Sequence, residues 1–335
     1  MDTGNQEITF DELLKRLDKS RVILIGEHHN RYDHHLNQLE LMCRLRARGH
    51  QIAIAVEFIQ QPFQHIVDDY ARGLIDEDEF LRQSEYFQRW GFDHRLYAPL
   101  LKFAKAHAIP VIALNIPGEV TSTVALHGLG GLNETQSQYV PTSMMAADEA
   151  YRARLRKIFA AHEGATTAEF DNFLDAQLLW DEGMAERAAR YLKDTPQMQL
   201  LIFAGNGHVA HRNAIAGRLL ARHPASLTII GQDQTGPCDV HYTLRSVEQQ
   251  LPPVGKLGVL LEDSEQGLRI TSFTSQSAAS DAVIEVEDHI VTINERATPT
   301  WPDLRRALWH KLPGDQVSIG IVRDGVEQTY ELTLR

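Results

Sequence analysis

The sequence contains only two cysteines, Cys43 and Cys238, and they are far apart in the chain. This scarcity excludes a scaffold built on disulfides and a cysteine-rich zinc site. No apolar run approaches the length that spans a membrane. Positive charge is also in deficit, because 33 Lys and Arg residues face 45 Asp and Glu residues and leave a formal net charge of −12. Nucleic-acid binding needs a broad basic surface, so we expect no nucleic acid among the partners.

The first residues also lack a leader. The stretch MDTGNQEITFDELL has no basic segment followed by an apolar one, and no cysteine that could carry a lipid. Two interpretations stay open on these residues. Either the protein is cytoplasmic, or the sequence is that of a form from which an export signal has been removed.

Five short apolar runs are typical of buried β-strands, at 21–26, 52–58, 109–116, 199–205 and 226–231. They are rich in Val, Ile and Leu without polar alternation, which is the pattern of a sheet covered on both faces. Helical patterns occupy 34–49 and 97–108, and a long insertion at 119–198 is mostly helical. This alternation predicts an α/β fold, a three-layer sandwich with a mainly parallel central sheet and a helical insertion.

The chain of 335 residues exceeds one typical domain, and its texture changes near residue 245. Beyond that point come short β-like runs, Gly and Pro turns, and one clear helix near 302–311. A Pro-Pro pair marks a stiff connection between the two parts. We therefore predict an α/β domain, a linker and a small β-rich domain, over 1–245, 246–254 and 255–335.

Polar side chains occur where four of the predicted strands end. They are Glu27, His28 and His29 at the first strand, Glu57 at the second, Asn115 at the third, and Asn206 and His208 at the fourth. Ligands of parallel sheets bind at the carboxyl ends of the strands. We therefore expect these groups to meet in one crevice.

Two of these strand ends share the spacing Gly-x-x-His, in GEHH at 26–29 and GNGH at 205–208. Two neutral imidazoles and a carboxylate would suit a divalent metal such as Mn, Co, Zn or Fe, so the predicted metal ligands are His29, Glu57 and His208. A metal-dependent hydrolase, either a peptidase or an esterase, would use the catalytic residues Glu27, His29, Glu57 and His208. The alternative is that each histidine is a hydrogen-bonded structural residue.

A predicted helix at 169–192 carries a second polar group. Gln177 and Asp181 lie on one face of this helix, beside core-like Met and Trp residues. One interpretation is that this face lines the same crevice. The other is a polar pair at the solvent edge of a packed helix.

The first domain resembles the ChaN-like family, which is associated with haem and iron uptake in Gram-negative bacteria. The resemblance covers roughly residues 8–245, and its motifs, in family order, are LIGEHHNRYDHHLNQLEL, AVEFIQQPFQ, YAPLLKFAKAHAIPVIALNIP, YRARLRKIFAAH, AQLLWDEGMAERAARYL and FAGNGHV. It implies a three-layer α/β sandwich. The sequence is more distantly similar to erythromycin esterases and to TraB/TIKI-type metalloproteases, whose two Gly-x-x-His motifs and glutamate fall on Gly26, His29, Glu57, Gly205 and His208.

The ChaN-like resemblance implies a haem-binding protein with tyrosine ligation and ligand-linked dimerisation, placed in the periplasm or held in the cell envelope as a lipoprotein. On this sequence the haem ligand falls on Tyr151, with His162 to assist it and Arg152, Arg154 or Arg156 to pair with the propionates. The residues alone also allow an amphipathic helix on which Tyr151 packs and the arginines are solvated. Tyr139 is a weaker rival as ligand.

The C-terminal part resembles a PDZ domain of the type found with bacterial proteases. The motifs are GKLGVLLE at 255–262, a helix DLRRAL and a hairpin PGDQVSIGIVRDG. The resemblance implies that an extended peptide, or the C-terminus of another protein, binds at Leu257, Gly258 and Val259. Val283 and Glu287 replace two usual glycines. Because a β-branched residue is strained at positive φ, we expect this loop to adopt another conformation.

Overall fold

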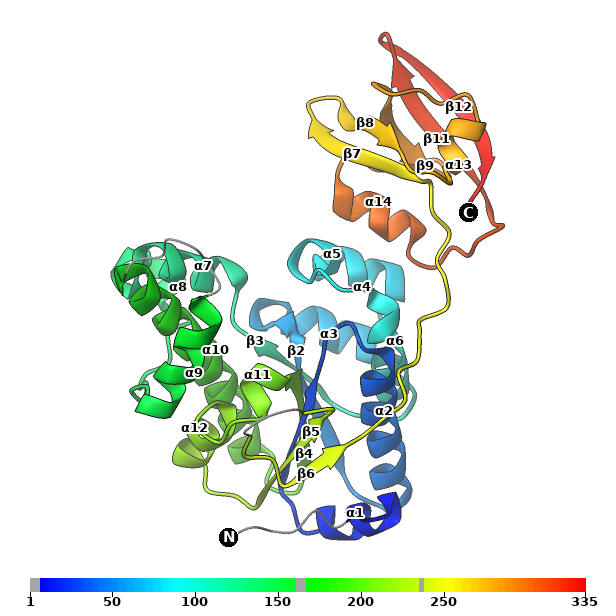
Figure 1. The fold of residues 1–335 in the computed structure, drawn as a ribbon. Helices are drawn as coiled ribbons and strands as arrows, with labels where there is room; N and C mark the ends of the chain where they lie inside the picture. The colour runs from blue at the N-terminus through cyan, green and yellow to red at the C-terminus, as the bar shows by residue number, and fades with distance from the viewer. Residues whose placement is uncertain (1–6, 161–166, 235–237) are drawn as a thin grey trace. The chain divides into compact units, whose positions relative to one another are not determined.

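The computed structural model describes residues 7–160, 167–234 and 238–335 (Figure 1). The chain divides into two compact units. Unit 1 comprises residues 1–76 and 98–249, and unit 2 comprises residues 77–97 and 250–335. The change from one unit to the other at residue 249 falls inside the segment predicted as a linker. Segment 77–97, in contrast, lies within the predicted α/β sequence but belongs to unit 2.

Unit 1 contains a six-stranded sheet in the order β3-β2-β4-β1-β5-β6. Every neighbouring pair of strands is parallel. The strands are β1 Val22–Glu27, β2 Ile52–Gln60, β3 Val111–Asn115, β4 Gln199–Gly205, β5 Leu227–Gln232 and β6 Tyr242–Leu244. The first five coincide with the predicted apolar runs, and the short β6 was not predicted. The fold class expected from the sequence is confirmed.

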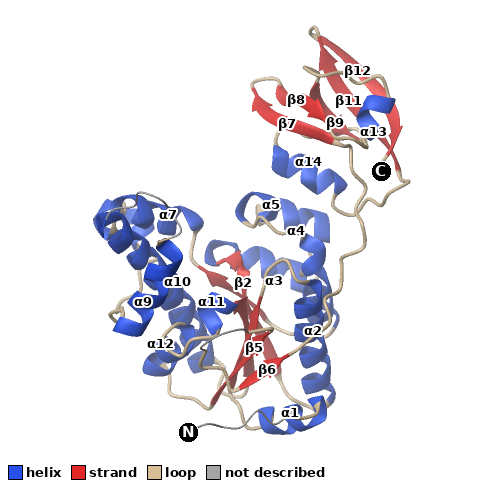
Figure 2. Cartoon of the chain, in the orientation of Figure 1, coloured by secondary structure: helices blue, strands red, loops and turns tan. Residues whose placement is uncertain are grey.

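Helices cover both faces of this sheet and give the three layers (Figures 1 and 2). One side carries α1 Phe10–Leu17, α2 Tyr32–Ala47, α3 Gln64–Ala71 and α6 Ala98–Ala106. The other side carries α10 Thr167–Asp194 and α12 Ile215–Arg222. The predicted helical insertion also contributes α7 Gly118–His127, α8 Glu134–Ser137 and α9 Glu149–Phe159.

The core of unit 1 explains the composition of its strands. Leu24 of β1 and Ile202 of β4 belong to one buried cluster with Met184 of α10 and Leu219 of α12. Every residue of β1, β2, β3 and β4 is buried. A strand covered on both faces has no solvent side that favours polar residues, so its sequence is a continuous apolar run.

Unit 2 is built on an antiparallel sheet in the order β12-β11-β9-β8-β7, with β10 paired to β9. Its elements are β7 Val259–Ser264, β8 Gly267–Phe273, α13 Ala278–Asp281, β9 His289–Ile293, β10 Arg296–Ala297, α14 Trp301–Leu308, β11 Gln316–Arg323 and β12 Val326–Thr333. Leu257, Ile270, Leu304 and Ile319 belong to its own apolar core. This is the small β-rich architecture expected after residue 254.

Segment 77–97 adds helices to unit 2. The Asp78 carboxylate accepts hydrogen bonds from Arg296 and from Arg306, the latter at 3.2 Å. The Arg305 guanidinium lies over the ring of Phe87, 5.0 Å from its centroid. These contacts join the sheet and α14 to the helices of the segment, which are α4 Glu77–Gln83, α5 Tyr86–Arg89 and the 3-10 helix His94–Leu96.

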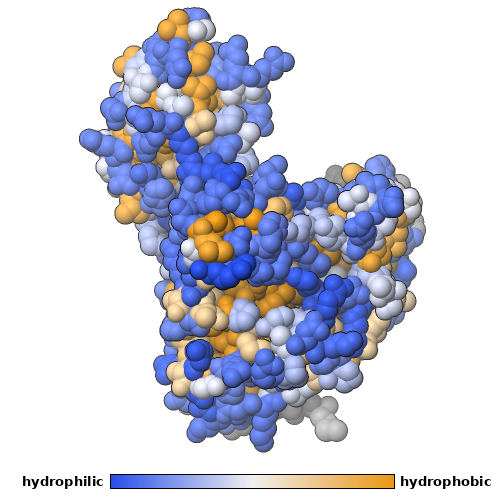
Figure 3. Space-filling view, turned by 180° about the vertical axis from the view of Figure 1, so that it is seen from behind, coloured by the Kyte–Doolittle hydropathy of each residue, from blue (hydrophilic) through white to orange (hydrophobic). Residues whose placement is uncertain are grey.

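The surface is mostly polar. Figure 3 shows hydrophilic residues over most of the face seen from behind, with apolar residues gathered in separate patches. No helix within residues 7–160, 167–234 and 238–335 is long and apolar enough to cross a membrane.

The expectation that the loop around Val283 and Glu287 avoids positive φ is wrong. Val283 has a φ of 62° and Glu287 a φ of 77°. Arg323 of β11 imposes this conformation, since it makes two hydrogen bonds of 2.7 Å to the Asp288 carboxylate and donates to the Val283 carbonyl at 3.0 Å. The surrounding contacts therefore hold a backbone shape that usually needs glycine.

We expect Val283→Gly to stabilise unit 2 by about 1 kcal/mol. The substitution relieves the strain of a valine in the left-handed region, and this gain exceeds the cost of the conformational entropy that a glycine loses on folding. Val283 is 67% exposed, so little packing is lost. Urea unfolding followed by tryptophan fluorescence measures this, since Trp90, Trp301 and Trp309 lie in unit 2.

Val286→Gly is the matched control for this variant, because Val286 is a neighbouring exposed valine outside the set of positive-φ residues. It should lower stability by about 0.5–1 kcal/mol. Equal effects of the two substitutions would contradict the strain assigned to Val283.

Candidate functional site

The candidate site lies at the carboxyl edge of the unit 1 sheet, where β2, β4 and β1 are neighbours. Glu27 is the last residue of β1, and Glu57 lies near the end of β2. His208 lies in the short helix α11, Asn206–Val209, which directly follows β4. Parallel pairing brings the three chain segments to one edge, as the sequence predicted.

Glu27 is buried and orients the ring of His29. Its Oε1 accepts a hydrogen bond from His29 Nδ1 at 2.9 Å, and its Oε2 accepts one from Gln38 Nε2 at 2.7 Å. Burial raises the pKa of Glu27. The charges of His35 and His29 and the hydrogen bonds to Glu27 lower the pKa by more than burial raises it, so that its value is about 2. Glu27 is therefore ionised at neutral pH and accepts a hydrogen bond from His29 Nδ1–H.

Glu57 contacts the turn that carries His208. Its Oε2 accepts a hydrogen bond from the Gly205 backbone N–H at 2.7 Å, and its Oε1 lies 3.7 Å from His208 Nε2. A Cβ at position 205 would lie 3.1 Å from His29 Nε2 and 3.6 Å from Glu57 Oε2. Glycine at 205 therefore lets the ring of His29 pack close to the backbone beside Glu57.

Asp181 of α10 orients His208 from the other side. Its Oδ1 accepts a hydrogen bond from His208 Nδ1 at 2.7 Å, and its Oδ2 accepts one from the Tyr151 hydroxyl at 2.7 Å. Burial lowers the pKa of His208, but Asp181 and Glu57 outweigh it and raise the pKa to about 9. Asp181, expected on a crevice-lining face, thus contacts the site directly.

The predicted catalytic residues Glu27, His29, Glu57 and His208 are therefore close together at one edge. Their catalytic and metal-binding roles stay predictions. The expected crevice residues Asn115 and Asn206 are buried at the ends of β3 and β4, and Gln177 is half-buried on α10. His28 is exposed beside the site.

The predicted haem ligand Tyr151 has surroundings that disfavour this role. Its side chain is 1% exposed, and its hydroxyl is bound to Asp181. Burial and the charge of Asp181 raise the pKa of Tyr151, so the tyrosinate that would bind iron is unfavourable. Arg152 lies at the surface, 3.7 Å from Asp171, and His162 lies outside the described residues.

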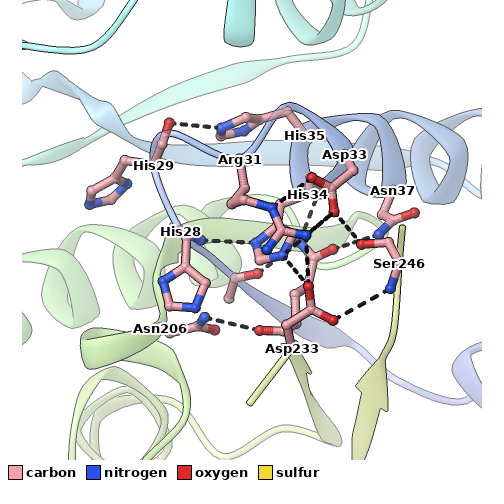
Figure 4. Close-up of polar contacts among 12 residues, drawn as sticks. His28, His29, Arg31, Asp33, His34, His35, Asn37, Asn206, Asp233 and Ser246 are labelled. Atoms are coloured by element: carbon pink, nitrogen blue, oxygen red, sulfur yellow. Dashed lines mark hydrogen bonds and ion pairs between the residues drawn. The ribbon is translucent and has the colours of Figure 1, made fainter. Parts of the chain in front are cut away.

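A polar cluster that was not predicted lies beside the turn of His28 and His29 (Figure 4). Arg31 donates hydrogen bonds to Asp33 at 2.8 Å and to Asp233 at 2.9 Å. His34 Nδ1 accepts the backbone N–H of His28 at 3.0 Å, so its Nε2 carries the proton donated to Asp233 at 3.1 Å. Both contacts fix the turn that carries the site histidines.

The same cluster contains the group Asp33, His34 and Asp233. Within the described parts of the chain, no other group of three potential metal ligands has its ligand atoms all within 4.8 Å of one another. Arg31 already balances the two carboxylates, and both nitrogens of His34 are occupied, so we assign no metal here. The predicted ligands His29, Glu57 and His208 are spaced more widely. The motif RYDHH contains Arg31, Asp33 and His34 of this cluster, but no local pattern marks Asp233.

Fold and site together define an α/β protein with a histidine–carboxylate centre at the carboxyl edge of its sheet, joined to a small β-rich unit. Residues 13–219 match the model of a family described as haem-binding uptake, Tiki superfamily, ChaN, and residues 255–334 match the PDZ domain model. The chain therefore belongs to the ChaN family and carries a PDZ domain. Both resemblances expected from the sequence are confirmed.

Solved structures include one described as cofacial heme binding to ChaN of Campylobacter jejuni. It has a TM-score of 0.56 and 15% identity, and the alignment covers 69% of this chain and 89% of that one, which supports the fold. An HtrA-type protease AlgW with decapeptide has a TM-score of 0.23 and 19% identity, over 24% of this chain and 30% of that one. An aminopeptidase N family protein from Idiomarina loihiensis has a TM-score of 0.24 and 28% identity, and the alignment covers 27% of this chain and 15% of that one. No curated protein matches the chain.

The raised pKa of His208 predicts a loss of stability at alkaline pH. Its contribution is fully present below the unfolded value of 6.5 and disappears as the pH rises through about 9. At about 1.4 kcal/mol per pKa unit, the free energy of unfolding of the ligand-free protein should fall by up to about 3 kcal/mol between about pH 6 and pH 10. Urea unfolding measures this, and His208→Gln should remove most of the decline. An equal decline in the variant would contradict the assignment.

Proposed function

We propose that this chain binds haem as part of bacterial haem and iron uptake, in the periplasm or cell envelope. Membership of a family described as haem-binding uptake supports this proposal. The observation that carries it is the pair of imidazoles at the sheet edge, each oriented by a carboxylate through Nδ1. His208 Nε2 lies 3.7 Å from Glu57 Oε1, and His29 Nε2 lies beside Gly205, whose backbone N–H binds Glu57.

The donor set of this edge fits a haem iron through nitrogen. The His29 side chain is 25% exposed and that of His208 is 16% exposed, so both rings reach the surface, unlike Tyr151. A carboxylate bound to Nδ1 makes an imidazole a stronger ligand and fixes its orientation. Bound haem would supply the iron, and this chain would supply an imidazole of His29 or His208. For His208, Nε2 must first lose its proton, because the pKa is raised to about 9.

Titration of the purified protein with hemin tests this proposal. We expect a Soret shift of the imidazole-ligated type, with affinity at least about 10-fold weaker in His29→Ala or His208→Ala, since a lost ligand removes the strongest contact. His65→Ala, at an exposed histidine of α3, is the matched control and should bind like wild type. A wild-type protein without spectral change would refute haem binding.

A second candidate is a metal-dependent hydrolase, and one observation favours it. His208 Nε2 lies 3.7 Å from Glu57 Oε1, beside the ring of His29, so these three side chains can converge on one ion with small movements. A divalent metal, when bound, would supply Lewis-acid activation of water. Glu27 and Asp181 would then orient the two histidines, and Glu57 would hold an ion or a proton at the edge.

Elemental analysis and calorimetric titration with Zn, Mn and Co test the hydrolase candidate. We expect micromolar binding in wild type and none in the His29→Ala/His208→Ala double variant, whose circular dichroism should be unchanged. A wild-type protein that binds none of these ions would remove the basis for this activity.

We also propose that unit 2 binds an extended peptide with a free C-terminus. β7 is at the end of the sheet order, so a peptide can pair with its outer edge. Gly258 has a φ of 75° and precedes β7, while Leu257 is part of the core behind it. Both features match the backbone turn that binds a peptide carboxylate in PDZ domains.

Fluorescence polarisation with a library of C-terminal peptides tests this interaction. Peptides with apolar last residues should bind with micromolar affinity, and the same peptides with an amidated C-terminus should bind at least about 10-fold more weakly, because the terminal charge is lost. Equal binding of both forms would argue against carboxylate recognition.

A further inference from the structure

Strand β7 has a free outer edge that begins at an unpaired backbone turn. The strand pairs with β8 on one side, and within the described residues no other strand pairs with it. The backbone N–H groups of Leu257 and Gly258, just before β7, make no hydrogen bond in the described parts of the chain. Leu257 is buried, and a buried N–H without an acceptor is costly. The turn is therefore suited to a terminal carboxylate, with an extended peptide antiparallel to β7.

The turn also fixes how such a peptide lies along the strand. The last residue of the peptide lies beside Val259, the first residue of β7, and each earlier residue lies beside the next residue of the strand. Asp263 follows Val259 by four residues, so it lies beside the peptide residue four before the end. Directly opposite residues of an antiparallel pair point to the same face. Asp263 therefore faces the side chain of that peptide residue.

The Asp263 carboxylate is available for a contact. Val259 and Leu261 pack against the core of unit 2, and Asp263 is the next side chain on the same face, because side chains alternate along a strand. It is exposed, and within the described residues its carboxylate has no hydrogen bond or ion pair. Glu262 points to the other face and pairs with Arg269 at 2.6 Å. Asp263 thus keeps a full negative charge on the face that receives the peptide.

The two ends of this edge carry opposite charges. Lys256 lies beside the turn suited to a carboxylate, whereas Glu265 follows Asp263 in the turn between β7 and β8. All three side chains are exposed. The edge is therefore positive where the peptide ends and negative beside its earlier residues. A tail with a cation before its carboxyl end complements this pattern.

We propose that Asp263 is a specificity-determining residue of unit 2, and that the partner is a protein whose C-terminal tail carries Lys or Arg four residues before an apolar last residue. This inference rests on the proposed peptide binding and adds the charge of the partner. Asp263 pairs with the cation at the surface and so selects among tails. The terminal carboxylate and the strand pairing supply most of the affinity.

Fluorescence polarisation of the full chain with three peptides tests the selection. The peptides differ only in Lys, Ala or Glu at the residue four before the end. At low ionic strength we expect the Lys peptide to bind about 3-fold more tightly than the Ala peptide, and the Glu peptide about 3-fold more weakly, because an exposed ion pair contributes modestly. Salt at about 0.5 M should remove most of the difference by screening. Equal affinities at low salt would overturn the proposal.

Charge substitutions assign the preference to one side chain. Asp263→Asn should abolish it and leave the affinity for the Ala peptide unchanged, and Asp263→Lys should reverse it in favour of the Glu peptide. Glu331→Gln is the matched control, because it removes one exposed negative charge from β12, at the other end of the sheet order. A preference that survives Asp263→Asn, or that Glu331→Gln weakens equally, would contradict the role of Asp263.

Failure of this inference is distinguishable from failure of peptide binding. If peptides with a free C-terminus bind more tightly than amidated ones, but the charge at the tested residue has no effect, peptide binding stands and the selection by Asp263 is refuted. If no peptide binds in either form, both proposals are refuted. Because Asp263 is exposed, its variants should keep the circular dichroism of wild type, so a changed preference reports the contact and not the fold.

Discussion

The site depends on the placement of β4 between β2 and β1. β4 follows the long helical insertion, yet it pairs in parallel with two strands from the first 60 residues. This pairing sets Gly205 beside Glu57 and brings the turn with His208 next to the turn with His29. Without this pairing of β4, the two Gly-x-x-His turns would not lie next to each other.

Buried carboxylates organise the site once the strands are paired. Removing an ionised carboxylate from water is costly unless its oxygens are hydrogen-bonded. Glu27 satisfies this requirement with His29 and Gln38, and its Oε2 also lies 3.5 Å from His35 Nδ1. Asp181 satisfies it with His208 and Tyr151. The same contacts determine that each ring binds its carboxylate through Nδ1. The need to stabilise a buried charge and the need to orient a ligand are thus met by a single arrangement.

Unit 2 illustrates how tertiary contacts override local preference. Val283 and Glu287 keep a backbone conformation that usually needs glycine. Arg323 holds this loop by donating hydrogen bonds to the Asp288 carboxylate and to the Val283 carbonyl. Unit 2 also includes segment 77–97, which lies in the middle of the α/β sequence. The family model spans this segment without a break, so its membership of unit 2 is visible only in the contacts.

The sequence by itself determined the α/β class, the five main strands and the polar residues at their ends, because burial on both faces leaves a recognisable apolar run. It also placed Glu27, His29, Glu57 and His208 among the candidates. Only the tertiary structure decided that Tyr151 and Asp181 support His208, that Gln38 supports Glu27, and that Arg31 joins Asp33 to Asp233. These contacts join residues from separate elements, and their hydrogen-bond geometry has no local signature in the chain.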